Sequence, residues 1–166
     1  MTTPHDRTHP PTSACQVSHL LRREIQAPIA AALIREFGRT IGEDRALEIA
    51  TAAVSGDAEA AGSEAAARLG GGSLAGLERL VREVWSAGDS MTVRFQESTE
   101  RRLSFDVTRC AYADLYERLG MRDLGFCLSC SRDEPFARGF NPRLKLVRTR
   151  TIMHGAPSCD FRFDLD

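Results

Sequence analysis

The spacing of apolar residues changes near Gly88, and this change constrains the fold more than any other feature of the 166-residue sequence. Before Gly88 the apolar residues recur at intervals of three and four, which is the period of a helix with one apolar side. After Met91 they alternate with polar residues, which is typical of a strand with one buried face. We therefore predict an α+β fold, in which N-terminal helices pack on a mostly antiparallel sheet with an inserted helix.

The first predicted helix begins at Val17 and ends near Gly38 and Gly42. Pro28 lies inside it and should kink the helix or divide it in two, because proline removes one backbone donor and crowds the preceding turn. The apolar stripe of this helix consists of Leu20, Leu21, Ile25, Ile29, Leu33, Ile34 and Phe37.

Two more helices complete the helical part. The second begins near Glu43 and continues through an alanine-rich stretch to Leu69, and so many alanines favour either close helix packing or a partly solvated surface. A glycine run, 70–72, then predicts a hinge, and Ser73 can cap a third helix that ends near Gly88.

The second half of the chain carries the strands. Residues 91–107 predict a β-hairpin, because two alternating segments flank a polar turn. A short helix should follow over 111–119, and Gly120 should end it. Residues 124–129 fit either a buried strand or a helical turn. Further strands are predicted around 144–146 and 159–163, with Cys159 and Asp160 on opposite faces.

Composition limits the possible functions. The formal charge of −1 provides no long-range attraction for nucleic acid or an anionic membrane, so we expect neither as a partner. No apolar run is long enough for a membrane span or a secretory signal, which predicts a cytoplasmic protein. We expect a disordered tail at 1–14 and a single domain at 15–166, with a helical part at 17–88 and a sheet part at 90–165. The odd number of cysteines, five, favours thiols over a disulfide scaffold.

Arg109 and Cys110 form the first candidate site, where the hairpin leaves the sheet for a helix. Free backbone amides and the neighbouring guanidinium would lower the thiol pKa from its usual ~8.5 and make Cys110 more nucleophilic. Arg109 could instead bind a substrate carboxylate. A buried structural cysteine beside a surface arginine explains the pair equally well.

Cys127-x-x-Cys130, followed by Asp133, is the second candidate. A structural zinc site requires four ligands, which His154 or other distant cysteines would have to complete. A thioredoxin-like role requires a βαβ unit, and the sequence predicts none. Two buried cysteines in an apolar segment remain the simpler interpretation. His154 could transfer protons at neutral pH, since its ordinary pKa is ~6.5, or could be a partly exposed residue at a strand end.

Several short motifs together resemble the L-2-amino-thiazoline-4-carboxylic acid hydrolase family. The resemblance implies a bacterial cytoplasmic enzyme that adds water across the C=N bond of a small cyclic amidine and gives a carbamoyl cysteine. It covers most of the chain from Leu20, and its specific part lies within 105–163. The motifs are Thr108-Arg109-Cys110-x-Tyr112, Cys130-x-x-Asp133, Phe140-Asn141-Pro142, Arg148-Thr149-x-Thr151, and Gly155 followed by Cys159-Asp160-Phe161.

This chemistry suggests roles for the candidate residues. We expect Cys110 or Cys130 to attack the ring, Asp133 or His154 to transfer protons, and Arg109 to bind the substrate carboxylate. A water activated by Asp133, with the thiols only lining the pocket, would serve equally well. The residues expected to bind substrate are Arg109, Tyr112, Asn141, Thr151 and Cys159.

Two other interpretations stay open. The C-terminal cysteines, alone or together with His154, could form a non-catalytic small-molecule or zinc-binding module. For an enzyme we expect no metal or other cofactor. The chain could also form a homodimer through its N-terminal helices, because an apolar stripe suits helix association. If catalysis is correct, Arg109–Cys110, Cys130–Asp133 and the Cys159 strand should meet at one cavity.

Overall fold

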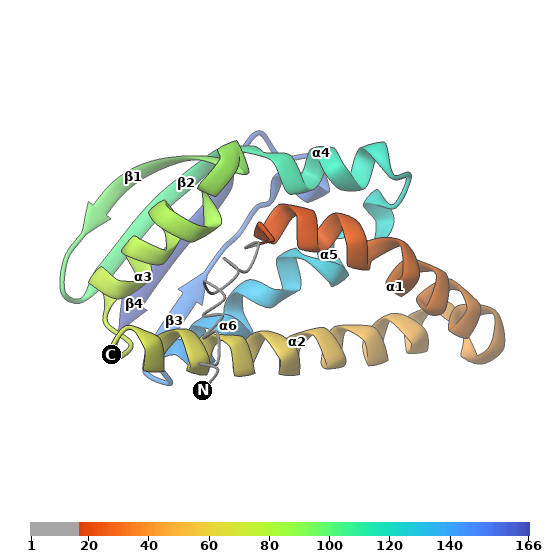
Figure 1. The fold of residues 1–166 in the computed structure, drawn as a ribbon, viewed down its shortest axis with the longest axis horizontal. Helices are drawn as coiled ribbons and strands as arrows, with labels where there is room; N and C mark the ends of the chain where they lie inside the picture. Colours follow the sequence, from red (N-terminus) through yellow and green to blue (C-terminus); the bar gives the residue numbers. More distant parts are fainter. Residues whose placement is uncertain (1–16) are drawn as a thin grey trace, which may run out of the picture.

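The computed structural model describes residues 17–166, which form the predicted α+β fold (Figure 1). The predicted tail, residues 1–14, lies outside the described residues. No helix within 17–166 is long and apolar enough to cross a membrane. The helices are α1 (His19–Ile41), α2 (Glu43–Arg68), α3 (Leu74–Leu80), α4 (Ala111–Arg118), α5 (Arg122–Leu128) and α6 (Asp133–Phe140), and the strands are β1 (Met91–Ser98), β2 (Arg102–Cys110), β3 (Leu144–Val147) and β4 (Cys159–Leu165).

Helix α1 is one continuous helix through Pro28, so of the two predicted outcomes, a kink or a division, the division does not occur. Pro28 lies on the exposed side, where solvent can satisfy the Glu24 carbonyl that loses its donor. Ser18 caps the helix by accepting a hydrogen bond from the Leu21 amide at 3.1 Å. Most of the predicted apolar stripe is exposed, because α1 buries a different side, formed by Ala27, Ala31, Ile34 and Gly38.

Helix α2 packs along α6 at very short range, as its small residues predict. A Cβ atom on Gly62 would lie 2.2 Å from the Phe136 carbonyl oxygen of α6. A Cβ atom on Gly139 of α6 would lie 2.0 Å from the Glu59 carbonyl oxygen of α2. The absence of both side chains therefore lets the two backbones touch, which fixes the position of α6 relative to α2.

Helix α3 begins at the predicted cap, where the Ser73 hydroxyl accepts a hydrogen bond from the Gly76 amide at 3.1 Å. It continues as one π-helical turn over Val81–Trp85 and a short 3₁₀ turn over Ala87–Asp89. Trp85, at the end of this wide turn, packs against α6, where its ring lies edge to face with the Phe136 ring and the two ring centroids are 5.3 Å apart. The third helix is thus present, but its last turns are irregular.

The four strands form one antiparallel sheet in the order β1-β2-β4-β3, and the predicted hairpin is its first pair. One face carries Phe105, Phe161 and Phe163, which are buried beneath the helices. The other face carries polar residues such as Arg162, whose guanidinium donates to the Asp106 carboxylate at 2.7 Å. The side chains of Asp160 and Cys159 point to opposite faces of the sheet, as strand alternation predicts.

Three helices, α4 to α6, connect β2 to β3, whereas the sequence predicts one inserted helix. The ambiguous segment 124–129 is helical up to Leu128, where α5 ends, and Ser129 is the C-cap of this helix. The sequence pattern missed α6 because only eight residues form it, and few of them are large and apolar.

Two hydrophobic cores lie side by side in this fold. One is formed between the buried face of the sheet and α2, α3 and α6. The other is formed by α1, α4, α5 and the first half of α2, at the other end of the molecule (Figure 1). Cys110 and Ile152 pack against both cores. The region between the cores is where the cavity described next is found.

Candidate active site

A cavity of about 350 Å³ opens between the sheet and helices α1, α2 and α6. This volume suits a small-molecule ligand. The Phe105 and Phe161 rings on its wall stack with their centroids 4.9 Å apart. The apolar part of the wall comprises Trp85, Met91, Phe105, Val107, Phe136 and Phe161.

Three thiols meet at this cavity: Cys110 from the end of β2, Cys130 from the turn between α5 and α6, and Cys159 from the start of β4. Cys159 is the pairing partner of Val107, so the sheet register brings it near the end of β2. The Cys159 sulfur also accepts a hydrogen bond from the Ile152 amide at 3.2 Å. The structure therefore brings together thiols that are up to 49 positions apart in the sequence.

All three thiols have raised pKa values. Burial raises the pKa of Cys110, although the amides of Ala113 and Tyr112 hydrogen-bond to the sulfur and act in the opposite direction. Burial is also the main cause that raises the pKa of Cys130 and Cys159. The expectation of a lowered Cys110 pKa is wrong, because desolvation outweighs the helix amides. These thiols are protonated at neutral pH.

Asp133, the first residue of α6, lines the same cavity and pairs with Arg148. The Arg148 guanidinium also donates to the Cys130 carbonyl at 3.0 Å and lies over the Phe161 ring, 5.2 Å from its centroid. Burial raises the pKa of Asp133, while the charge and hydrogen bond of Arg148 act to lower it. A carboxyl group with a raised pKa is better able to accept a proton near neutral pH.

A second charged cluster lines the cavity on the side of α1 and α2. The Arg132 guanidinium pairs with the Asp57 carboxylate at 2.6 Å, while Arg23 donates to the side-chain oxygen of Gln26 at 3.1 Å. Burial, followed by the nearby charge of Arg132, lowers the pKa of Arg23. Arg23 has no carboxylate partner within residues 17–166. Two guanidinium groups, of which only Arg132 is paired with a carboxylate among the described residues, favour binding of an anion.

The structure places Tyr112 at the cavity and Arg109 away from it. Burial raises the pKa of Tyr112 to about 12, so its hydroxyl stays a hydrogen-bond donor. The Arg109 guanidinium donates to the Asp89 carbonyl at 2.8 Å, and its side chain is 55% exposed. Arg109 is therefore not positioned to bind a ligand in this cavity.

His154, Thr151 and Asn141 also lie outside the cavity. His154 and Thr151 line a second cavity that shares Arg148 with the first, and the His154 ring stacks on Phe126 at 4.5 Å. The Thr151 hydroxyl accepts from the His154 amide at 3.2 Å, which caps a short turn. Asn141 donates to the Gly72 carbonyl at 2.8 Å. The side-chain amide of Asn141 and the hydroxyl of Thr151 thus form hydrogen bonds with backbone groups of the fold.

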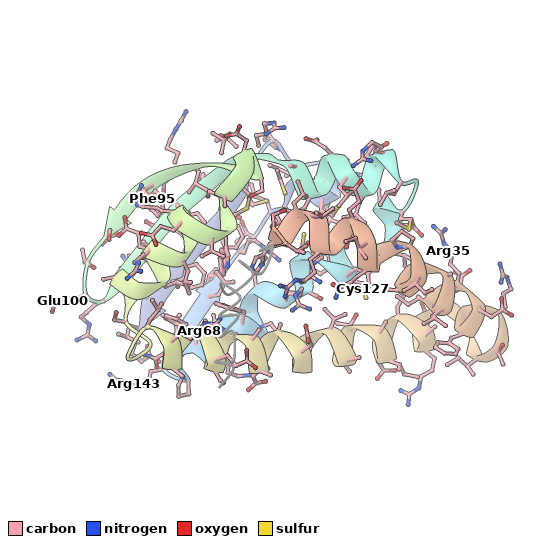
Figure 2. All side chains as sticks on the ribbon, viewed as in Figure 1. Arg35, Arg68, Phe95, Glu100, Cys127 and Arg143 are labelled. Atoms are coloured by element: carbon pink, nitrogen blue, oxygen red, sulfur yellow. The ribbon has the colours of Figure 1, made fainter. Side chains whose placement is uncertain are left out.

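Cys127, the first cysteine of the Cys-x-x-Cys motif, faces α2 and does not line the cavity (Figure 2). Its sulfur lies 3.2 Å from the Thr51 hydroxyl. Of the two cysteines of the motif, Cys127 thus points toward α2 and Cys130 toward the cavity. Over residues 17–166, no group of three or more histidine, cysteine, aspartate or glutamate side chains is arranged to hold a metal ion.

A family model described as L-2-amino-thiazoline-4-carboxylic acid hydrolase matches residues 22–163. The chain belongs to this family. The match extends from the arginines of α1 to the end of β4, so it includes almost every residue of the cavity wall. No curated protein and no solved structure gives a match. The family description names a hydrolase and its substrate, and it does not name the groups that act.

Sequence reasoning missed most of the polar residues of the hydrolase-family cavity, among them Arg23, Asp57, Arg132 and Arg148. Arg148 belongs to one of the motifs that carry the family resemblance, and this was the only signal for it. Arg23, Asp57 and Arg132 have the sequence surroundings of ordinary surface charges on helices. Their proximity follows only from the packing of α1 and α2 against the start of α6.

Proposed function

We propose that the protein hydrolyses a small cyclic amidine that carries a carboxylate, of the 2-amino-thiazoline-4-carboxylate type. The observation that carries this proposal is the location of Asp133, a carboxyl group with a raised pKa, in the same cavity as the Arg23–Arg132 pair. The family match supports it, because the family description names this reaction. The cavity also suits the substrate in size and in its flat aromatic walls.

Arg23 and Arg132 would bind the substrate carboxylate in place of Arg109. Both guanidinium groups line the cavity, and the single Asp57 carboxylate leaves the pair with an excess positive charge. A substrate carboxylate would supply the missing negative charge and accept two hydrogen bonds from one guanidinium plane. The aromatic rings of Phe105 and Phe161 would then lie along the face of the heterocycle.

Asp133 would act as general base for the attacking water. The carboxylate takes one proton from water as the water oxygen bonds to C2, the amidine carbon, and the ring nitrogen takes a proton from solvent water as the C=N bond becomes single. The tetrahedral centre then collapses as the ring C–S bond to C2 breaks: the new hydroxyl releases its proton to solvent and becomes the C=O group, and the proton held by Asp133 goes to the departing sulfur. The product equals the substrate plus one water, which is the composition of a carbamoyl cysteine.

Water is a better candidate nucleophile than the thiols in this cavity. Cys110 and Cys130 have raised pKa values and lie among apolar groups, and the guanidinium of Arg109 is turned away from Cys110. A protonated thiol is a weak nucleophile, so attack by cysteine would require a base to remove its proton. We therefore assign the thiols to the lining of the cavity, where they contact the substrate.

The test compares single substitutions in the ring-opening reaction, with product identified by a mass gain of one water. Asp133→Asn should lower kcat/KM by ~10²-fold or more, as for loss of a general base. Cys110→Ser and Cys130→Ser should keep most of the activity. Asp123→Asn is the matched control, because Asp123 is an exposed carboxylate paired with Arg35 outside the cavity.

Thermal unfolding of each variant separates a loss of chemistry from a loss of folding. Full activity in folded Asp133→Asn would overturn the assignment of the base. Loss of activity in folded Cys110→Ser or Cys130→Ser, together with a covalent adduct of substrate on the wild-type thiol, would make that cysteine the nucleophile. Failure of the wild-type protein to open any cyclic amidine carboxylate would overturn the proposed function itself.

A further inference from the structure

The exposed apolar side chains of this protein are concentrated on one helix. Nine large hydrophobic residues are exposed within 17–166, and six of them lie on α1 at intervals of four residues. We call this row the α1 ridge. Exposure is greatest near its middle, at 64% for Ile25 and 69% for Ile29. The α1 ridge consists of Leu21, Ile25, Ile29, Leu33, Phe37 and Ile41.

The middle of the ridge also lacks charge. Residues 25–34 contain no charged side chain, although the outer side of α1 faces solvent there. Charges of both signs lie at the two ends, and several are already paired: Arg35 with Asp123 at 3.3 Å, and Arg39 with Glu36. Figure 2 shows Arg35 extending from the C-terminal half of α1. A contact over the ridge would therefore bury little unpaired charge.

The area of the ridge matches what a stable dimer needs. A row spaced by four residues turns slowly around the helix, so only its middle faces one partner. The middle four side chains, Ile25, Ile29, Leu33 and Phe37, present roughly 470 Å² of apolar surface when ~200 Å² is taken for a fully exposed residue. A standard interface buries ~800 Å² on each partner, and its centre is ~65% apolar, so the ridge supplies most of the apolar centre of such an interface.

The spacing of the ridge suits a second copy of the same helix. Rows of side chains spaced by four residues form the ridges that interlock when two helices cross at about −50°. A twofold axis near Ile29 and Leu33 would place the most exposed part of each ridge against the other, in a contact that is the same on both chains. The small exposed neighbours Pro28 and Ala32 would allow a close approach at this crossing.

Two other occupants fit less well. Residues 1–16 of the chain contain a single large apolar side chain, Met1, so this segment has little with which to cover the ridge. A helix that lies on a membrane typically has basic residues along its polar side. The side of α1 opposite the ridge is instead buried in the protein by small residues such as Ala27 and Ala31. We propose that the α1 ridge is the contact surface of a symmetric homodimer.

Sedimentation equilibrium and light scattering of the full chain test this proposal. The wild-type protein should have twice the mass of the 18.3 kDa chain at micromolar concentration. Ile29→Glu combined with Leu33→Glu should raise the dimer dissociation constant by ~100-fold or more, because the contact would bury two carboxylates from each chain. Both positions are exposed, at 69% and 52%, so the helix and its core should remain intact.

Val147→Glu is the matched control, since Val147 is an apolar side chain with 54% exposure on the edge strand β3. This variant should remain dimeric. A monomeric wild-type protein at 100 μM would overturn the proposal, as would a dimer that persists in the Ile29→Glu, Leu33→Glu variant. Flotation of the wild-type protein with phosphatidylcholine–phosphatidylglycerol vesicles, lost in the same variant, would assign the ridge to a lipid surface instead.

Discussion

Gly62→Ala should destabilise the protein, although alanine is the better helix former. The new Cβ atom would lie 2.2 Å from the Phe136 carbonyl oxygen and 2.8 Å from the Phe140 amide nitrogen, whereas ordinary contacts begin at 3.4 Å. Both neighbours are backbone atoms, so they cannot rotate away as a side chain can. Helix α6 would have to move by about 1 Å, and packed interiors resist such shifts.

The expected magnitude follows from two opposing effects. Alanine gains ~1 kcal/mol over glycine inside a helix. Overpacking costs ~1–3 kcal/mol when side chains can adjust, and more is expected where two backbones collide. The net loss should be roughly 2 kcal/mol, which corresponds to a melting temperature about 4–8 °C lower for a chain of this size. Circular dichroism during thermal and urea unfolding measures both quantities.

Gly56→Ala is the control in the same helix, because a Cβ atom on Gly56 would have no atom within 4 Å. This substitution should stabilise the protein by ~0.5–1 kcal/mol. The two variants therefore differ in the sign of their effect and not only in its size. If Gly62→Ala is as stabilising as Gly56→Ala, the close contact between α2 and α6 does not exist in solution.

Three further predictions concern buried polar groups. Asp160→Ala should cost roughly 2–4 kcal/mol, because it removes the acceptor for the Thr149 and Arg150 amides. Burial raises the pKa of Asp160, but hydrogen bonds from the Thr149 hydroxyl and from backbone amides outweigh burial and leave the pKa lowered. The ionised Asp160 therefore stabilises the folded protein above pH ~4, and urea unfolding should show that this stabilisation is lost as the pH falls further. Tyr116→Phe should be neutral or stabilising, since the buried hydroxyl has no hydrogen-bond partner within 17–166, and a loss above 1 kcal/mol would contradict this. Iodoacetamide should modify Cys110 in the native protein ~10-fold more slowly at pH 7.5 than in urea, as measured by mass spectrometry, because burial keeps this thiol protonated.

Much of the fold can be predicted from local patterns. The switch from helical to alternating spacing near Gly88 predicts the helices and the hairpin, and Ser73 and Gly120 mark real ends of helices. Local patterns fail where tertiary contacts decide. Pro28 is tolerated because it faces solvent, and α6 forms on the surface offered by Gly62, although its own sequence contains no clear apolar stripe.

The candidate site was only partly predictable. The convergence of Cys110, Cys130, Asp133 and Cys159 on one cavity was expected from the motifs and is present in the structure. Arg109 was assigned to the same place because it is adjacent in sequence to Cys110. Neighbours on a strand point to opposite faces, and Arg109 accordingly extends away from the cavity.

By itself, the sequence determined the α+β class with N-terminal helices followed by a sheet, the family and the residues that supply the thiols and Asp133. These features depend on local periodicity and on short motifs, which are complete within a few positions of the chain. Only the tertiary structure decided that Arg23 and Arg132 form the anion cluster, that burial raises the thiol pKa values, and that the apolar residues of α1 face outward. Each of these depends on which surfaces meet, and desolvation and charge proximity exist only after distant segments have packed together.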